Sequence, residues 1–353
     1  MAKHKRVTLQ DVANQAGVSR QTVSRVINNK DGVADETRAR IQDTINAMGY
    51  RPNLAARGLT QQRTRIIGLV IPYTPDYLFT DPHLLKQMSA VDQILGLRRY
   101  TLLLTTAVAN GTLLDASVRE LSAFERLLEA GYVDGVILCE TPFSAEGIAL
   151  LEQHDYHWVI LGYYHKGGEG VYAVHADDRG GARQAIMHLL SLGHQRIGII
   201  SGPEQSIQAV DERLIGCRVA LEEHHLELDP TFVTHGDFTM ESGARAAAQL
   251  MTCEPAPTAI FALNDRMAIG AMQYVQAQGL RVPQDVSIVG FDDVPISKMC
   301  NPKLTTIHQP AQEMGKQAAR LLFDLIEDQS MLPQSVVLPT ELIVRDSTGL
   351  VAR

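Results

Sequence analysis

The chain has 353 residues, 45% of them hydrophobic and 20% charged, a composition that excludes a disordered chain and indicates two or three folded domains. No run of 18 apolar residues occurs and no apolar stretch follows the basic first residues, which excludes a membrane span and a secretion signal and predicts a cytoplasmic protein. The net charge of −8 divides into +7 for residues 1–65 and −15 for the rest, which favours a nucleic-acid-binding head on an acidic body, although charge alone also fits a solvated basic surface.

Residues 8–16 have the pattern of a capped helix. Thr8 is a good N-cap residue, and Asp11 three positions later is close to a capping box and favourable for the helix dipole. Gly17 then permits a tight turn. The apolar residues that share one face of the predicted helix are Leu9, Val12, Ala13 and Ala16.

A second helix is predicted from Arg20 to about Asn28, with Ser19 as its cap. Its buried side comprises Val23, Val26 and Ile27, which leaves Arg20, Gln21, Ser24 and Arg25 outward. Arginine and glutamine make bidentate contacts to base edges in the major groove, and Thr22 suits a phosphate or a thymine methyl. The alternative is an ordinary solvated helix face, which the preceding Ala-Gly-Val-Ser turn disfavours.

A third helix is predicted over residues 35–48, ending at Gly49. Its inward residues are Thr37, Ile41, Ile45 and Met48. The following segment, residues 53–59, is short, weakly amphipathic and contains Gly58, so we expect it to be largely unfolded when free and helical on DNA. Residues 60–65 are polar and are interpreted as a linker.

Residues 7–59 resemble the head of the LacI/GalR family of bacterial repressors. The resemblance is carried by V-T-L-Q-D-V-A-N-Q-A-G-V-S-R-Q-T-V-S-R-V-I-N and by G-Y-R-P-N-L-A-A-R-G-L. It implies that the second helix enters the major groove, and that Leu59 of a hinge helix wedges into the minor groove with Ala56 against its floor. Ala34 departs from the serine that usually caps the family's third helix. The expected DNA contacts are Thr8, Ser19, Arg20, Gln21, Thr22, Ser24, Arg25, Asn28, Tyr50, Asn53, Ala56, Arg57 and Leu59.

From Ile66 onward, apolar strand-like runs alternate with helical segments. Strands are predicted at 66–71, 100–105, 133–139, 158–161, 196–200, 258–263 and 286–291, with helices such as 114–130, 179–192 and 208–224 between them. This alternation predicts parallel sheets covered by helices on both faces, in two lobes with a cleft between them.

The family resemblance extends to about Ser347 and implies a body similar to periplasmic sugar-binding proteins. It divides the chain into a helix-turn-helix domain (1–50), a hinge helix and linker (51–65) and an effector-binding domain (66–353). We expect an N-lobe of about 66–162 and 293–323 and a C-lobe of about 163–291 and 324–347.

The resemblance also implies which residues contact the effector. Arg213 and Asp292 together suit vicinal hydroxyls, and Phe238 suits the apolar face of a sugar. The alternatives are a structural ion pair between Arg213 and Asp292, and a helix-capping role for Asp265. Tyr163 stands where relatives carry arginine or aspartate, which leaves the identity of the sugar open. The expected effector contacts are Tyr73, Tyr163, Arg213, Phe238, Asn264, Asp265, Asp292 and Gln309.

The resulting prediction is a homodimeric transcriptional repressor of carbohydrate-utilisation genes that binds a pseudo-palindromic operator and responds to a sugar or sugar-derived effector. The alternatives are a purine, a nucleoside or another non-sugar effector, an effector-independent DNA binder, and an enzyme in which Asp292 and Asp293 act as acid and base. No P-loop, G-x-S-x-G, HExxH or Cys-His pattern occurs, so no enzyme, cofactor or metal site is expected. The four widely spaced cysteines predict reduced thiols, and the absence of a C-terminal heptad helix favours a dimer.

Overall fold

The computed structural model describes residues 7–27, 30–50, 63–71, 75–106, 131–139, 145–163, 170–203, 207–328 and 330–351. The chain divides into two compact units, Met1–Arg65 and Ile66–Arg353, which we call the head and the body. In these described ranges no helix is long and apolar enough to cross a membrane.

The described residues of the head, 7–27, 30–50 and 63–65, contain three helices, α1 (Leu9–Ala16), α2 (Arg20–Ile27) and α3 (Asp35–Met48). The predicted capping box of α1 is confirmed, because Thr8 Oγ1 accepts from the Asp11 amide at 3.3 Å and Asp11 Oδ2 accepts from the Thr8 amide at 2.8 Å. Gly17 follows with a left-handed φ of 65°, a backbone conformation that residues other than glycine rarely adopt. Ala34 provides no side-chain cap for α3. The head's core comprises Val12, Ala13, Ala16, Val23, Val26 and Ile41.

The N-lobe of the body is built on a six-stranded parallel sheet with the order β11-β5-β4-β3-β1-β2. Helices α6 and α13 pack together on one face, and α8 covers the other. The elements of this lobe are β1 (Ile66–Ile71), α5 (Pro75–Thr80), α6 (Pro82–Leu97), β2 (Thr101–Thr106), β3 (Gly135–Cys139), α8 (Ala145–Gln153), β4 (His157–Leu161), β5 (Ala173–Ala176), α13 (Ala311–Glu327) and β11 (Ser335–Leu338).

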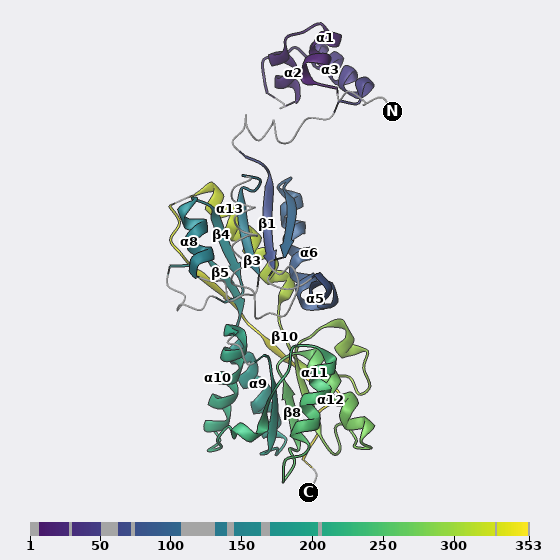
Figure 1. Cartoon of the computed structure of the whole chain (residues 1–353), viewed down its shortest axis with the longest axis vertical. Coiled ribbons are helices and arrows are strands. Elements are labelled where there is room, and N and C mark those ends of the chain that lie inside the picture. The colour runs from purple at the N-terminus through teal and green to yellow at the C-terminus, as the bar shows by residue number, and fades with distance from the viewer. Residues whose placement is uncertain are drawn as a thin grey trace. The chain divides into compact units, whose positions relative to one another are not determined.

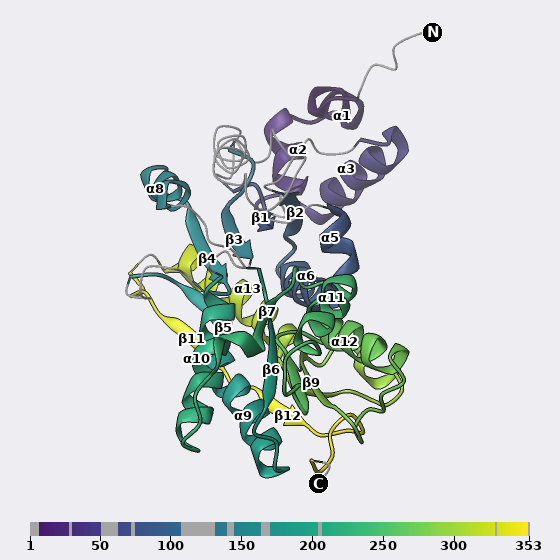
Figure 2. The same ribbon diagram turned by 60° about the horizontal axis from the view of Figure 1, so that its bottom comes forward.

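The C-lobe is built on a second six-stranded sheet, in the order β12-β10-β9-β8-β6-β7, in which only β12 runs antiparallel to its neighbour. Helices α9 and α10 lie on the opposite side of this lobe from α11 and α12 (Figures 1 and 2). Its elements are α9 (Asp178–Ser191), β6 (Ile197–Ser201), α10 (Gln208–Glu222), the 3₁₀ turn Pro230–Phe232, β7 (Val233–His235), α11 (Met240–Leu250), β8 (Ala259–Ala262), α12 (Asp265–Ala277), β9 (Ser287–Asp292), the 3₁₀ turn Pro295–Lys298, β10 (Thr305–His308) and β12 (Glu341–Ile343).

The predicted fold class is confirmed, but the predicted lobe boundaries are wrong. The chain crosses between the lobes after β5, after β10 and after β11, whereas we expected crossings near residues 162, 292 and 323. The first two crossings were placed one strand too early because β5 and β10 have only four residues each, and β10 is half threonine. The third falls after β11 because α13 packs on the N-lobe sheet. The predicted helix 114–130 lies outside the described residues.

The last described residues are held to the C-lobe by a buried histidine, His194, and a half-buried one, His188. His194 Nε2 donates a hydrogen bond to the Gly349 carbonyl oxygen at 3.0 Å, while Nδ1 lies 3.0 Å from Thr258 Oγ1. His188 Nε2 lies 3.0 Å from Thr348 Oγ1. Burial lowers the pKa of both imidazoles, so the folded chain favours their neutral forms.

Candidate DNA-binding surface and effector cleft

The exposed face of α2 begins directly at its cap. Ser19 Oγ accepts from the Thr22 amide at 3.1 Å, as predicted, and this starts the helix with Arg20 and Gln21 in its first turn. Both side chains are exposed, and Arg25 is exposed one turn later. Val23 and Val26 fix the opposite face in the head's core. An exposed arginine and glutamine at the start of a helix present the donors and acceptors that read base edges.

Two other predicted DNA contacts have structural roles within the head. The Thr8 hydroxyl donates to Asp11 Oδ2 at 2.7 Å, within the capping box, and Tyr50 packs against the head's core. Ser24 is half-buried on α2. The remaining predicted contacts, Asn28, Asn53, Ala56, Arg57 and Leu59, lie outside the described residues.

Arg213 of α10 is the most heavily engaged cation of the body's candidate site. Its Nε donates to Asp178 Oδ1 at 2.6 Å, and its Nη1 donates to the Leu263 carbonyl oxygen. The guanidinium lies over the Phe291 ring, 3.9 Å from the centroid. Its Nη2 lies 4.0 Å from Asp292 Oδ1. The ion pair that we considered between Arg213 and Asp292 is therefore longer than the pair between Arg213 and Asp178. Asp178 was not identified from the sequence, because an aspartate at the start of a predicted helix is an ordinary feature.

Asp292 ends β9 with a left-handed φ of 106°, an uncommon conformation for a non-glycine residue. Its Oδ1 accepts from Gln309 Nε2 at 2.6 Å, which brings two of the predicted effector residues together. Burial raises the pKa of Asp292 to about 6, and the charges of His83 and Arg213 oppose this rise. The result is a carboxylate that is held beside the lobe crossing and takes up a proton as the pH falls through about 6.

The loop that begins α12 contains Asn264 and Asp265, which differ in their roles. Asn264 is the N-cap of α12: its Oδ1 accepts from the Met267 amide at 2.8 Å, and its Nδ2 donates to the Phe238 carbonyl oxygen at 3.1 Å. Phe238 has a left-handed φ of 65°, and its ring covers Gly202, where a Cβ atom would lie only 2.7 Å from it. Asn264 therefore positions the aromatic residue that we expected to stack on an effector.

Asp265, which we predicted to contact the effector, is buried and hydrogen-bonded to the loop after β9. This side chain is 0% exposed, and its carboxylate accepts from the Val294 amide at 2.8 Å and from the Thr306 hydroxyl. Burial raises its pKa well above the usual value, and the neighbouring Asp292 charge adds to the rise. Asp265 fixes the loop after β9, and the helix cap that we considered for it is supplied by Asn264 instead.

Tyr163 lies at the end of β4 and braces the neighbouring strand. Its hydroxyl donates to the Ala176 carbonyl oxygen at 2.9 Å, and its ring centroid lies 4.0 Å from that of His175. Burial raises the pKa of Tyr163. The Tyr163 hydroxyl is thus hydrogen-bonded to the last residue of β5, next to the first lobe crossing. Tyr73 lies outside the described residues.

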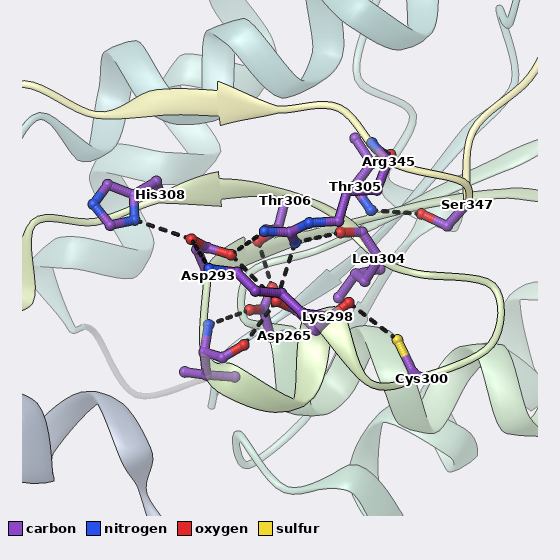
Figure 3. Close-up of polar contacts among 12 residues, drawn as sticks. Asp265, Asp293, Lys298, Cys300, Leu304, Thr305, Thr306, His308, Arg345 and Ser347 are labelled. Atoms are coloured by element: carbon purple, nitrogen blue, oxygen red, sulfur yellow. Dashed lines mark hydrogen bonds and ion pairs between the residues drawn. The ribbon is translucent and has the colours of Figure 1, made fainter.

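The loop after β9 is anchored by charge around Asp293 (Figure 3). The Asp293 carboxylate accepts from Arg345, and its Oδ2 lies 3.2 Å from His308 Nδ1 and 3.6 Å from Lys298 Nζ. These contacts lower the pKa of Asp293, although burial opposes them. The cluster of Asp293, Arg345, His308 and Lys298 therefore holds the residue next to Asp292 in an ionised, fixed state.

The first turns of α6 form the N-lobe side of the site, which sequence reasoning did not identify. Lys86 Nζ donates to the Asp293 carbonyl oxygen at 3.3 Å, and Asp81 Oδ2 lies 3.7 Å from Arg266 Nη1. His83, between them, acts electrostatically on Asp292. No apolar run or known motif marks these residues, so only the fold brings them beside Arg266 and Asp293.

Comparison with known proteins identifies both parts of the chain. Residues 8–53 match the model of bacterial regulatory proteins of the lacI family, and residues 186–348 match a periplasmic binding protein-like domain. The transcriptional regulator CelR of Thermobifida fusca is 37% identical over 98% of this chain and 100% of its own length. The chain belongs to the LacI family. The resemblance read from the sequence is thereby confirmed, and with it a DNA-binding transcriptional regulator.

Other LacI-family proteins match over nearly the whole chain. The repressor CytR of Escherichia coli K12 is 33% identical over 97% of this chain and 96% of its own length. A structure of the CelR–cellobiose complex has a TM-score of 0.73 at 36% identity, covering 97% of this chain and all of its own. The lac repressor dimer bound to operator and an anti-inducer has a TM-score of 0.86 at 28% identity, covering 98% of this chain and all of its own.

Proposed function

We propose that this LacI-family protein represses carbohydrate-utilisation genes, and that a neutral sugar bound in a cleft between the lobes controls its affinity for the operator. The observation that carries this proposal is the meeting of Asp292, Gln309 and Arg213 where the chain crosses between lobes. Asp292 Oδ1 lies 2.6 Å from Gln309 Nε2 and 4.0 Å from Arg213 Nη2. A ligand bound there touches the lobe crossing directly.

The chemistry of these groups suits a polyol. A carboxylate accepts hydrogen bonds from hydroxyl groups, a guanidinium donates to them, and such charge-assisted bonds are the stronger ones. Phe238 offers an aromatic surface of the kind that commonly lines small-molecule sites. The CelR–cellobiose complex, 36% identical in sequence, supports a sugar as the ligand class.

Control of DNA binding follows from different sugar affinities of two arrangements of the body. A ligand shifts an equilibrium by its differential affinity for the two states, and no more. We propose that the protein acts as a homodimer, with Arg20 and Gln21 reading the major groove and Leu59 the minor groove. The lac repressor dimer on its operator supports this assembly.

Titration of the full-length protein with cellobiose in a calorimeter tests the proposal, together with operator binding followed by fluorescence anisotropy. We expect saturable binding of the sugar, a change in operator affinity of at least fivefold, and recovery of the cellobiose unchanged. The absence of binding to a panel of neutral mono- and disaccharides would overturn the sugar assignment. Turnover of the sugar would favour the enzyme alternative.

A further inference from the structure

Two polar contacts join the lobes beside the candidate effector residues, and both start from the first two turns of α6. Asp81 Oδ2 pairs with Arg266 Nη1 at 3.7 Å, and Lys86 Nζ donates to the Asp293 carbonyl oxygen at 3.3 Å. The side chains of Arg266 and Asp81 are only 15% and 12% exposed. The charged pair is thus largely shielded from water. Salt screens such partly buried pairs less than it screens exposed ones.

Each partner of this ion pair is fixed within its own lobe. Asp81 is the N-cap of α6, and its Oδ1 accepts from the amides of His83 at 2.9 Å and Leu84 at 3.3 Å. Its second oxygen, Oδ2, is the one that reaches Arg266. Arg266 lies in the first turn of α12, directly after the buried Asp265. The pair therefore joins the beginnings of two helices that belong to different lobes.

The pair is also close enough to the candidate effector site to respond to it. The charges of Asp81 and His83 both act on the Asp292 carboxyl group. Lys86 contacts the backbone of the next residue, Asp293, which Arg345 and His308 hold in place. A change in the separation of the lobes at this edge changes the Asp81–Arg266 distance directly.

We propose that Asp81 and Arg266 form a latch that holds the cleft closed on the side of α6. The latch exists only in the closed arrangement, so its strength sets the fraction of closed molecules and the apparent affinity for an effector. Its link to effector affinity rests on the proposed function. The latch itself is a property of the effector-free chain, and it is tested there first.

Hydrogen exchange followed by mass spectrometry on the full-length, ligand-free protein tests the latch. The variants are Arg266→Gln and Asp81→Asn; asparagine is as good an N-cap as aspartate, so the second variant removes the charge and keeps the cap. Arg245→Gln is the matched control, because it breaks an exposed pair of similar length within the C-lobe, Arg245–Asp237 at 3.5 Å.

We expect the backbone amides of residues 83–88, 293, 294, 296 and 297 to exchange at least fivefold faster in both latch variants and at the wild-type rate in Arg245→Gln. The double variant Asp81→Asn/Arg266→Gln should match the single variants, because the second substitution removes nothing further. Wild-type exchange in both single variants, or additive effects in the double variant, would overturn the latch.

Cellobiose calorimetry on the same proteins tests the link to the effector. We expect each latch variant to bind cellobiose about tenfold more weakly than the wild type. Unchanged affinity together with faster exchange would overturn the coupling of latch and ligand. If the wild type itself binds no sugar, the sugar assignment fails, and the exchange experiment still decides the latch.

Discussion

Gln309 donates a hydrogen bond to Asp292 over 2.6 Å, and this bond ties the carboxylate at the end of β9 to the segment that leads from β10 into α13. Gln309 is buried, with an exposed fraction of 5%. Any ligand that moves the Asp292 carboxylate therefore also displaces Gln309, which lies at a crossing between the lobes. This relationship underlies the first two predictions.

Replacing Asp292 with asparagine removes the charge of the acceptor that we propose for the effector. Hydrogen bonds to charged groups contribute about 1.5–3 kcal/mol, so we expect sugar affinity to fall roughly 10- to 150-fold. Calorimetry measures the change. Asp237→Asn, an exposed aspartate of the same lobe, serves as the control and should bind normally. Equal affinities for the two variants would remove Asp292 from the site.

The raised pKa of Asp292, about 6, predicts pH-dependent ligand binding. Since an ionised carboxylate is the better acceptor, affinity should rise about tenfold between pH 5 and pH 7 and then level off. The pH dependence of folding stability has the opposite sign, because burial favours the protonated form of Asp292. The contribution of Asp292 to the free energy of unfolding is full below its unfolded pKa and is lost as pH rises through about 6. The wild-type slope should disappear in Asp292→Asn, and a slope that persists there would assign the titration to another group.

His194 should stabilise the C-terminal segment only in its neutral form. Its pKa is lowered by burial, so its contribution is present above the unfolded value near 6.5 and is lost as pH falls below it. We expect His194→Ala to lower the free energy of unfolding by about 1–3 kcal/mol at pH 8, because Ser287, Thr258 and Gly349 lose a partner. Thermal unfolding from pH 5 to pH 8 measures this. His224→Ala, at the exposed end of α10, should leave the melting temperature within error.

The exposed start of α2 predicts which residues specify the operator. Replacing Arg20 or Gln21 with alanine should cost about 1–3 kcal/mol in operator affinity if each reads a base edge, a loss of roughly 5- to 150-fold. The loss should be smaller on unrelated DNA. Arg40→Ala removes an exposed positive charge from α3 and is the control for charge alone. Losses of the same size for Arg20 and Arg40 would show that Arg20 contributes charge and no sequence information.

Leu59→Ala tests the hinge, which lies outside the described residues. A minor-groove wedge offsets the cost of unstacking a base step by bending the DNA around more protein surface. We expect operator affinity to fall at least tenfold while sugar affinity stays unchanged. Anisotropy and calorimetry measure the two. An unchanged operator affinity would remove Leu59 from the DNA contacts.

The sequence predicted the three described helices of the head because their signals are local. The Thr8–Asp11 cap, the Gly17 turn and the Ser19 cap each depend on residues no more than three positions apart. The helices therefore begin and end where the residue types require. The long apolar strands of the body, such as β1 and β9, were predictable for the same reason.

The lobe crossings and several contacts of the candidate effector residues were not predictable, because they depend on partners far apart in the chain. Strand β5 is only four residues long, and its hydrogen bonds come from β4 and β11. Asp178 lies 35 positions from Arg213, and Asp265 meets Thr306 only after β10 has paired with β9. Burial of Asp265 is a property of the packed loop, and its residue type gives no indication of it.

The last crossing has a consequence for how the protein is made. A ribosome synthesises β1 to β5 first, then the whole C-lobe up to β10, and only afterwards α13 and β11. Until these last pieces emerge, the apolar face that α13 covers, including Ile137, Val159 and Leu161, lacks its partner. The N-lobe is therefore completed after much of the C-lobe has already been made, and a nascent chain arrested near residue 300 lacks the helix that completes the N-lobe core.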